Sequence, residues 1–382
     1  LARAAVAKGY ERAFSAIFDS NLTTFLTALI LYKIGTGSVK GFGLTLMIGI
    51  ATSLFCSLTV TRAIFDWRLA KNDANKLSIG KGFRAIDEAN LSIIPRSKTF
   101  AIFSAILLVA SLATVVVRGF DFSIDFLGGQ VYTVQYSETG AHEEDLSKVA
   151  ASAGLTNAKV RSYGDQAKNM YQISLKKTDD ATVKDRLQKA LDDAGQKAQI
   201  IASDEVGPTI GKELRFNAIL SIILSWIAIC LYILFIFGKL GLGFGVGALV
   251  GLVHDTIISI GFISLMGLSV DGALIASVLT LIGYTINDKI VVFDRIRENS
   301  QIYGRSNFPK LVNSSINQCF SRTIITSLTT LFVCLILAVM GGSSIRDFGL
   351  VMVFGIIIGT YSSITISSPF VVWWSKRFRS GV

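Results

Sequence analysis

Two residues of opposite charge lie inside long apolar stretches of this 382-residue chain: Asp288 in LTLIGYTINDKIVVFDRIREN and Arg322 in CFSRTIITSLTT. An ionisable side chain at the centre of a membrane helix costs about 3 kcal/mol, so it usually belongs to an ion path or a buried pair. At ~1.5 Å per residue, both lie about 8–9 Å from the same membrane face, so we expect them to meet. The pair either holds two helices together or titrates, with the position of Arg322 setting the proton affinity of Asp288.

Further polar side chains share the faces of these two residues. Tyr284 precedes Asp288 by four residues, so both lie on one side of a helix. Thr326 follows Arg322 at the same spacing. Asn287 is of a type that forms hydrogen bonds between membrane helices. The candidate proton-coupling site is therefore Asp288, Arg322 and Thr326, with Tyr284 and Asn287 as secondary candidates.

A second pair of ionisable residues lies in the middle of another apolar stretch. His254 and Asp255 are adjacent in GALVGLVHDTIISIGF. They are either further proton-coupling groups or a hydrogen-bonded pair that holds helices together. We keep both residues as secondary candidates.

The cysteines do not have the spacing of a metal or catalytic centre. Cys56, Cys230, Cys319 and Cys334 each stand inside an apolar run, without a CxxC or Cys/His pattern. We therefore expect free thiols and no metal site. We also expect no cofactor and no enzyme activity.

The elements that position these residues are long apolar segments. Apolar residues make up 51% of the chain and charged residues 17%, below the roughly 25% of soluble domains. A membrane-spanning helix needs about 20 mostly apolar residues. Eight stretches meet or approach that length: 16–34, 42–64, 99–117, 214–237, 242–266, 273–293, 316–340 and 347–374. The predicted fold class is a mostly α, polytopic membrane protein.

Charge is distributed unevenly between the loops. Residues 118–213 carry 12 basic and 15 acidic residues, which leaves 25 basic and 12 acidic residues for the rest. Basic residues gather from Arg62 to Lys98, from Arg295 to Lys310, and from Lys376 to Arg379. This asymmetry predicts that both termini are cytoplasmic and that 118–213 is outside. The net charge of +10 thus reflects topology and does not indicate nucleic-acid binding.

Strand and helix patterns alternate within the polar segment. Strands are expected at 130–137, 159–163, 170–177 and 199–203, and helices at 142–153 and 181–194. The order βαββαβ is that of the ferredoxin-like unit. We expect a small α/β outer domain, with Gly128-Gly129 as a tight turn before its first strand.

An internal repeat relates the two ends of the chain. A shift of 306 residues places 13–67 over 319–373 without a gap, and 18 of 55 positions are identical. Leu22-Thr23-Thr24 matches Leu328-Thr329-Thr330, and Phe42-Gly43-Leu44 matches Phe348-Gly349-Leu350. Parallel repeats of this kind are common in transporters. Counterparts of helices three to six would lie upstream of Leu1, so we expect the last third of one six-helix half followed by a complete second half.

Several motifs resemble those of one known family. Residues 1–69 resemble the C-terminal end of SecD, in FDSNLTT at 18–24 and GTGSVKGF at 35–42. Residues 90–382 resemble SecF, in IDFLGG at 124–129, VGPTIGKEL at 206–214, VHD at 253–255, IGYTINDKIVVFDRIREN at 282–299, SRTIITSLTT at 321–330 and GTYSSI at 359–364. The resemblance implies a fused SecD–SecF subunit of the bacterial protein-export machinery, in the resistance-nodulation-division superfamily.

The resemblance also implies a division of the chain and a function. SecD-like helices would occupy 1–69, a cytoplasmic linker 70–98, the first SecF-like helix 99–117, an extracytoplasmic domain 118–213 and the other SecF-like helices 214–382. The implied subunit lies in the bacterial inner membrane and couples the proton-motive force to protein export. Its implied partners are the Sec translocon channel with its accessory subunits, exported unfolded polypeptides and the lipid bilayer, without nucleic acid.

By position, the family's membrane-embedded Asp is Asp288 and its partner Arg is Arg322. Lys289 stands where the family usually has Thr or Ser. Adjacent helical residues point about 100° apart, so Lys289 need not pair with Asp288. The second proton-carrying Asp of SecD, in a VDANVLI-type motif, is absent from this sequence. Two alternatives stay open: a small-molecule or lipid exporter of the same superfamily, and a non-conducting scaffold of the translocon.

Overall fold

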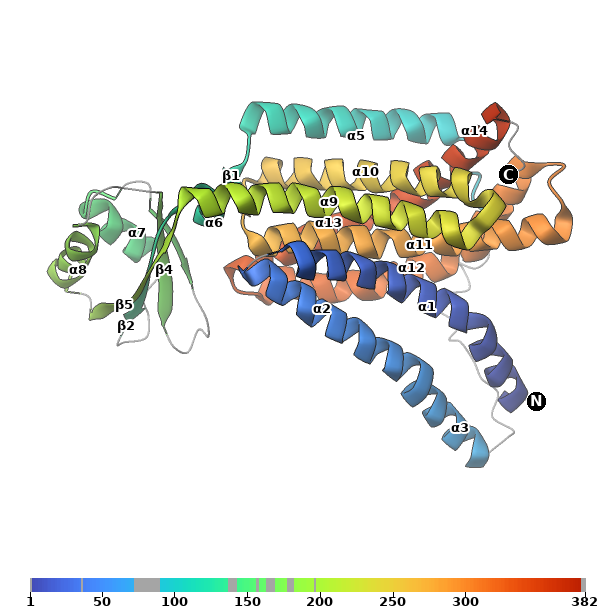
Figure 1. Cartoon of the computed structure of the whole chain (residues 1–382), viewed down its shortest axis with the longest axis horizontal. Helices are drawn as coiled ribbons and strands as arrows, with labels where there is room; N and C mark the ends of the chain where they lie inside the picture. The colour runs from blue at the N-terminus through green and yellow to red at the C-terminus, as the bar shows by residue number, and fades with distance from the viewer. Residues whose placement is uncertain are drawn as a thin grey trace.

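The computed structural model describes residues 2–35, 37–71, 90–136, 143–155, 158–162, 169–176, 182–195 and 197–378. Within these ranges, eight helical segments are long and apolar enough to cross a membrane. They form one elongated bundle, and a small α/β domain stands at one end of it (Figure 1). The predicted class of a mostly helical, multi-pass membrane protein is confirmed.

Each of the eight predicted stretches lies within one of these segments. The segments are α1 (Ala2–Ile34); α2 (Gly37–Phe55), continued by the π-helical turn η1 (Cys56–Val60) and α3 (Thr61–Lys71); α5 (Ser97–Arg118); α9 (Pro208–Phe237); α10 (Gly241–Met266); α11 (Gly272–Tyr303); α12 (Phe308–Met340); and α13 (Ser343–Ser362), continued by the π-helical turn η5 (Ser363–Ser367) and α14 (Ser368–Phe378). A 3₁₀ turn, η4 (Gly238–Leu240), joins α9 to α10. The helices extend beyond the predicted bounds because their polar ends continue the backbone hydrogen bonding past the apolar span.

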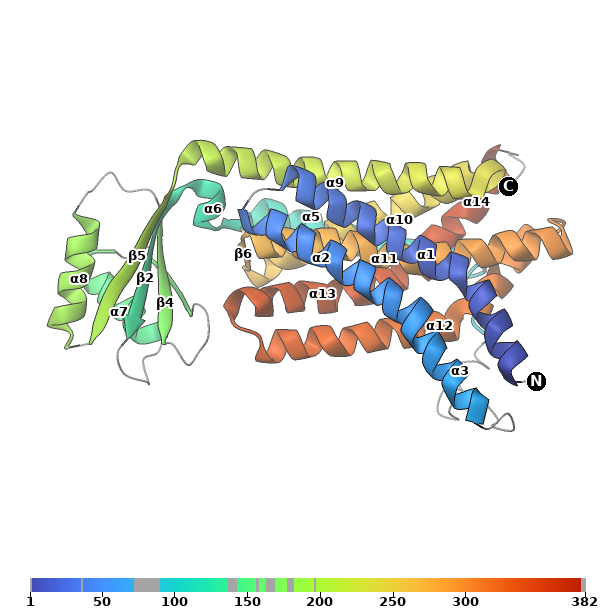
Figure 2. The same ribbon diagram turned by 60° about the horizontal axis from the view of Figure 1, so that its bottom comes forward.

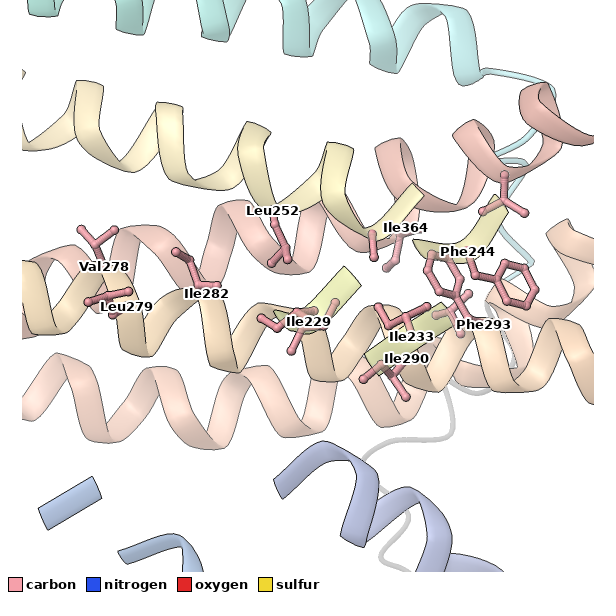
Figure 3. Packing of buried hydrophobic residues seen from close by; sticks show 14 of the residues in the cluster. Ile229, Ile233, Phe244, Leu252, Val278, Leu279, Ile282, Ile290, Phe293 and Ile364 are labelled. Carbon is pink, nitrogen blue, oxygen red and sulfur yellow. The ribbon is translucent and has the colours of Figure 1, made fainter. Parts of the chain in front are cut away.

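Helices α10 and α11 form the centre of the bundle. Their apolar spans are 61% and 72% buried, against 6% for α5. Close approach depends on small residues: a Cβ added to Gly261 of α10 would lie 2.3 Å from the Cβ of Ser111 on α5. Phe244 of α10 stacks on Phe293 of α11 with ring centroids 4.8 Å apart (Figure 3). Polar side chains on α10 and α11 are therefore enclosed by protein.

The internal repeat appears as two equivalent helix pairs, α1–α2 and α12–α13. A Cβ added to Gly43 would lie 2.7 Å from the Tyr32 nitrogen, and one added to the equivalent Gly349 would lie 2.6 Å from the nitrogen of Ala338, the equivalent of Tyr32. Each pair thus crosses closely at the same glycine. The second helix of each pair also passes through a π-helical turn at nearly the same position.

The two copies of the repeat meet at their equivalent phenylalanines. Phe42 of α2 contacts Phe348 of α13, with ring centroids 5.5 Å apart. Equivalent residues touch each other where a local symmetry axis passes between them, so the repeat is a property of the fold as well as of the sequence. Helices α2 and α3 diverge from the bundle, and α3 ends on the side where the N-terminus of the chain lies (Figure 2).

The outer domain has one four-stranded antiparallel sheet. Its strands β2 (Gly129–Tyr136), β3 (Lys159–Ser162), β4 (Met170–Lys176) and β5 (Ala198–Val206) lie in the order β3-β4-β2-β5. Helix α7 (Glu143–Ser152) precedes β3, and α8 (Val183–Asp193) precedes β5. Leu146 and Leu187 from these helices share a buried core with Val134 and Ile173 of the sheet. The expected helix start at His142 lies outside the described residues.

Two short strands connect the outer domain to the bundle. β1 (Asp121–Phe122) pairs in parallel with β6 (Ser269–Val270), which lies between α10 and α11. α6 (Ile124–Leu127) follows β1 and ends at Gly128, with φ +79°. A Cβ added to Gly129 would lie 2.1 Å from the Leu175 carbonyl oxygen. The predicted Gly-Gly turn is therefore present, and it is packed against β4.

Candidate ion-coupling site

Three consecutive residues of α11 contact three different neighbouring helices. Successive side chains on a helix point about 100° apart. Asn287 contacts α1, Asp288 contacts α12 and Lys289 contacts α10. This central helix therefore connects three parts of the bundle through polar groups.

Lys289 is completely buried and forms an ion pair with Asp255. Its Nζ lies 2.8 Å from Asp255 Oδ2, and the exposed fractions of the two side chains are 0% and 3%. Nζ also donates to Ser362 Oγ at 3.2 Å and to the Thr285 carbonyl at 3.4 Å. A buried charge is tolerated when it is both paired and hydrogen-bonded. Lys289 thus neutralises Asp255, a pairing that the sequence pattern had not identified.

His254 extends this cluster on the other side of Asp255. Its Nδ1 lies 3.0 Å from Asp255 Oδ1, so the two carboxylate oxygens face different partners. His254 Nε2 is buried and has no hydrogen-bond partner among the described residues. The adjacent candidates His254 and Asp255 are therefore in direct contact, within a charge cluster that includes Lys289.

Two glycines provide the space for the cluster. A Cβ added to Gly251 of α10 would lie 2.4 Å from Lys289 Cε. A Cβ added to Gly359 of α13 would lie 2.1 Å from Thr285 Cγ2. Because no side chain occupies these positions, α10 and α13 can approach α11 closely enough to enclose the ammonium group.

Asp288 lies on the α12 side of α11 and is 7% exposed. Ser327 of α12 donates a long hydrogen bond of 3.4 Å to Asp288 Oδ2. Ser327 is also 2.7 Å from the Thr360 hydroxyl of α13. No ion pair of Asp288 is present in the described part of the chain, so the contact seen for this buried carboxyl there is with the Ser327 hydroxyl and not with a cation.

The expected contact between Asp288 and Arg322 is absent from the structure. No ion pair or hydrogen bond joins these two described side chains, and Arg322 is exposed on α12. Arg322 precedes Ser327 by five residues, which places it about 140° around the helix from the residue that faces Asp288. Thr326 is exposed too, and its hydroxyl donates to the Arg322 carbonyl at 2.9 Å. The predicted stripe of Arg322 and Thr326 exists, but it lies on the outer face of α12.

The other two candidates contact different helices. Tyr284 donates to the Thr326 carbonyl at 3.2 Å, so it does lie toward α12 as expected from its spacing. Asn287 accepts a hydrogen bond of 3.3 Å from Thr23 of α1. Thr24 donates to the Gly283 carbonyl at 2.9 Å. Asn287 thus belongs to the α1–α11 interface, as the prediction of an interhelical hydrogen bond required.

Comparison with known proteins agrees with the motifs in the sequence. Residues 186–377 match the family model described as "Protein export membrane protein SecD/SecF, C-terminal", and residues 114–139 match "SecD/SecF GG Motif". A protein translocase subunit SecF from Calditerrivibrio nitroreducens is 36% identical over 295 residues, which cover 75% of this chain and 94% of that protein. The chain belongs to the SecD/SecF family.

Longer members of the SecD/SecF family match along almost the whole chain. The protein translocase subunit SecDF of Thermus thermophilus is 38% identical over 379 residues, covering 98% of this chain and 50% of that protein. The crystal structure of SecDF, a translocon-associated membrane protein, from Thermus thermophilus superposes with a TM-score of 0.82 at 35% identity, over 98% of this chain and 50% of that chain. This SecD/SecF chain therefore spans about half the length of the SecDF relatives it matches.

Proposed function

We propose that this chain acts within an accessory subunit of the Sec protein translocase and couples the proton-motive force to protein export across the bacterial inner membrane. The observation that carries the proposal is the contrast between two buried carboxyls of the central helices. Asp255 is neutralised by Lys289, whereas no cation contacts Asp288 among the described residues. A proton is the cation that can reach and neutralise such a group without rearranging the helices.

The proton-coupling step is assigned to Asp288. An ionised carboxylate that is buried, with one long hydroxyl contact and no contacting cation among the described residues, is unfavourable. Release of its proton therefore requires a change in its surroundings. Arg322 and Thr326 lie on the same helix, α12, as Ser327, so a rotation or shift of α12 would change which of these groups faces Asp288. In this proposal, movement of α12 alternates Asp288 between a proton-binding and a proton-releasing environment.

The repeat supports a partner for the exposed face of α12. Thr23 of α1 contacts Asn287 of α11, and the equivalent of Thr23 is the exposed Thr329 of α12. We propose that a helix equivalent to α11 packs on this face in the longer relatives. Arg322 and Thr326 would then lie between two halves of the molecule. At this position, Arg322 and Thr326 could transmit a movement of α12 from one half of the molecule to the other.

The outer domain completes the proposal. The chain order βαββαβ and the sheet order β3-β4-β2-β5 support assignment to the ferredoxin-like class. We place this domain outside the inner membrane and both termini in the cytoplasm, on the basis of the charge asymmetry between loops. The proposed partners are the translocon channel with its accessory subunits, the exported unfolded polypeptide and the surrounding bilayer. A mechanical role of this kind needs no catalytic residue and no cofactor.

The test compares Asp288→Asn with Asp294→Asn in the protein with its natural flanking sequence. Asp294 is a matched control, because it lies on the same helix but is half exposed and hydrogen-bonded to Arg297. We expect Asp288→Asn to assemble normally and lose the stimulation of export by the proton-motive force, measured on a secreted protein in energised inverted membrane vesicles. Asp294→Asn should keep it. Export at the wild-type rate with Asp288→Asn would instead favour a non-conducting scaffold.

A further inference from the structure

The ammonium of Lys289 lies in a site lined by oxygen atoms from three helices. These are the carboxylate of Asp255 on α10, the carbonyl of Thr285 on α11 and the hydroxyl of Ser362 on α13, at 2.8, 3.4 and 3.2 Å. Carboxylates, backbone carbonyls and other neutral oxygens are the ligands that hard cations take from proteins. The surroundings of Nζ are therefore those of a cation site.

Two hydroxyls of residues next to this site have no hydrogen-bond partner among the described residues. Thr285 Oγ1 and Ser367 Oγ form no hydrogen bond among the described residues, and their side chains are 1% and 0% exposed. A Cβ added to Gly251 would lie 2.1 Å from Ser367 Oγ and 2.4 Å from Lys289 Cε, so this hydroxyl and the lysine adjoin the same space. A buried hydroxyl without a hydrogen-bond partner lowers the stability of the folded protein. These hydroxyl oxygens remain available as cation ligands, in addition to the three oxygens that contact Nζ.

The charge of the site requires one monovalent cation. Asp255 contributes one negative charge, and its second oxygen lies 3.0 Å from His254 Nδ1. Tyr361 of α13 also faces His254, with ring centroids 6.5 Å apart. A buried carboxylate left without a cation is strongly unfavourable. In this chain the cation is covalently attached to α11.

We propose that Lys289 is a tethered cation whose ammonium occupies a monovalent-cation site between α10, α11 and α13 and closes that site to free Na⁺. A shorter, neutral side chain at position 289 leaves the oxygen donors in place and opens the site to Na⁺. A side chain of similar length but without charge fills the space and excludes the ion. This inference concerns Asp255 and is independent of the proposed role of Asp288 in export.

The experiment measures the melting temperature of the purified protein in detergent at pH 8, as choline chloride is replaced by NaCl at constant ionic strength. Four proteins are compared: wild type, Lys289→Ser, Lys289→Met and Lys289→Ser combined with Asp255→Asn. A ligand that binds the folded state raises stability with the logarithm of its concentration once it exceeds Kd. We expect the melting temperature of Lys289→Ser to rise with NaCl and the other three to stay constant. Binding of radioactive Na⁺ should follow the same pattern.

Three results would overturn the proposal. The first is a melting temperature of Lys289→Ser that does not respond to Na⁺, or one that still responds after Asp255→Asn. The second is a wild-type protein that responds as strongly as Lys289→Ser, since the ammonium would then not close the site. The third is failure of Lys289→Ser to fold in either salt while Lys289→Met folds, because Na⁺ would then not replace the ammonium. Loss of export would not bear on any of these outcomes.

Discussion

Asp288 and Lys289 are adjacent in sequence but contact different helices. Lys289 turns toward α10, where Asp255 balances its charge at 2.8 Å. Asp288 turns toward α12 and meets the Ser327 hydroxyl at 3.4 Å. Lys289 therefore leaves Asp288 without a contacting cation among the described residues. Helix α11 thus carries a buried lysine that is paired with a carboxylate of α10, next to a buried carboxyl that contacts no cation among the described residues.

A double-mutant cycle on the buried pair tests this division. Asp255→Asn leaves the ammonium of Lys289 buried and unpaired, which should cost about 3–5 kcal/mol in the free energy of unfolding. Adding Lys289→Met removes the stranded charge and should recover most of that loss, because a well-packed apolar replacement of a buried pair is often neutral. Chemical unfolding in detergent gives both values. Equal stability of wild type and Asp255→Asn would contradict the buried pair.

The sequence predicted the helices well and one side-chain contact wrongly, for different physical reasons. An apolar run of about 20 residues is sufficient evidence for a spanning helix, and all eight were present. Depth along a helix can also be estimated from residue number, which led to the expected pair of Asp288 and Arg322. The direction around the helix depends on which neighbour packs where, and the sequence did not contain that information. For the same reason, the partnership of Lys289 with Asp255 and the contacts of Ser327 and Thr360 were missed.

The helix pairs of the repeat depend on a glycine crossing that can be tested with an internal control. Gly43 and Gly349 face backbone atoms of the preceding helix, so Ala at either position should separate the helices and cost about 1–3 kcal/mol. Gly49 lies on the same helix as Gly43, but a Cβ there would meet nothing within 4 Å. Gly49→Ala should be neutral or stabilising by about 0.5–1 kcal/mol. Thermal unfolding of the three variants measures this, and unequal effects of Gly43→Ala and Gly349→Ala would argue against equivalent crossings.

The molecule as a whole joins a helical bundle to a small α/β domain at one end. The parallel pair β1–β6 and the Gly128-Gly129 turn lie where the chain leaves the bundle. The outer domain has its own core of side chains from α7, α8 and the sheet, separate from the core around α10 and α11 (Figure 3). The two parts should therefore respond differently to conditions such as alkaline pH.

Alkaline pH should destabilise the outer domain through Tyr136. Burial, together with the nearby Tyr171 and Asp145, raises the pKa of Tyr136 from 10.0 to about 12. The folded domain thus keeps the phenol protonated where an unfolded chain would ionise it. Its contribution to stability is complete below pH 10 and is lost as pH rises toward 12. Unfolding followed by circular dichroism between pH 10 and 12 should show this loss of stability. The Tyr136→Phe variant should lose less stability over the same range. If its pH dependence equals that of the wild type, another group causes the loss.

The orientation of the whole chain follows from where its charges lie, and cysteine labelling measures it. Ser147 on α7 and Ser306 between α11 and α12 are both exposed, so a cysteine at either position is open to a reagent in its own compartment. The four natural cysteines are free thiols, and Cys56 is exposed, so they are replaced first. In intact cells with a permeable outer envelope, a membrane-impermeant thiol reagent should label Ser147→Cys and leave Ser306→Cys unlabelled, because basic loops stay in the cytoplasm. After the inner membrane is opened, both positions should react equally, which controls for local reactivity. Labelling of Ser306→Cys in intact cells would reverse the proposed orientation and place the α/β domain on the opposite side of the membrane.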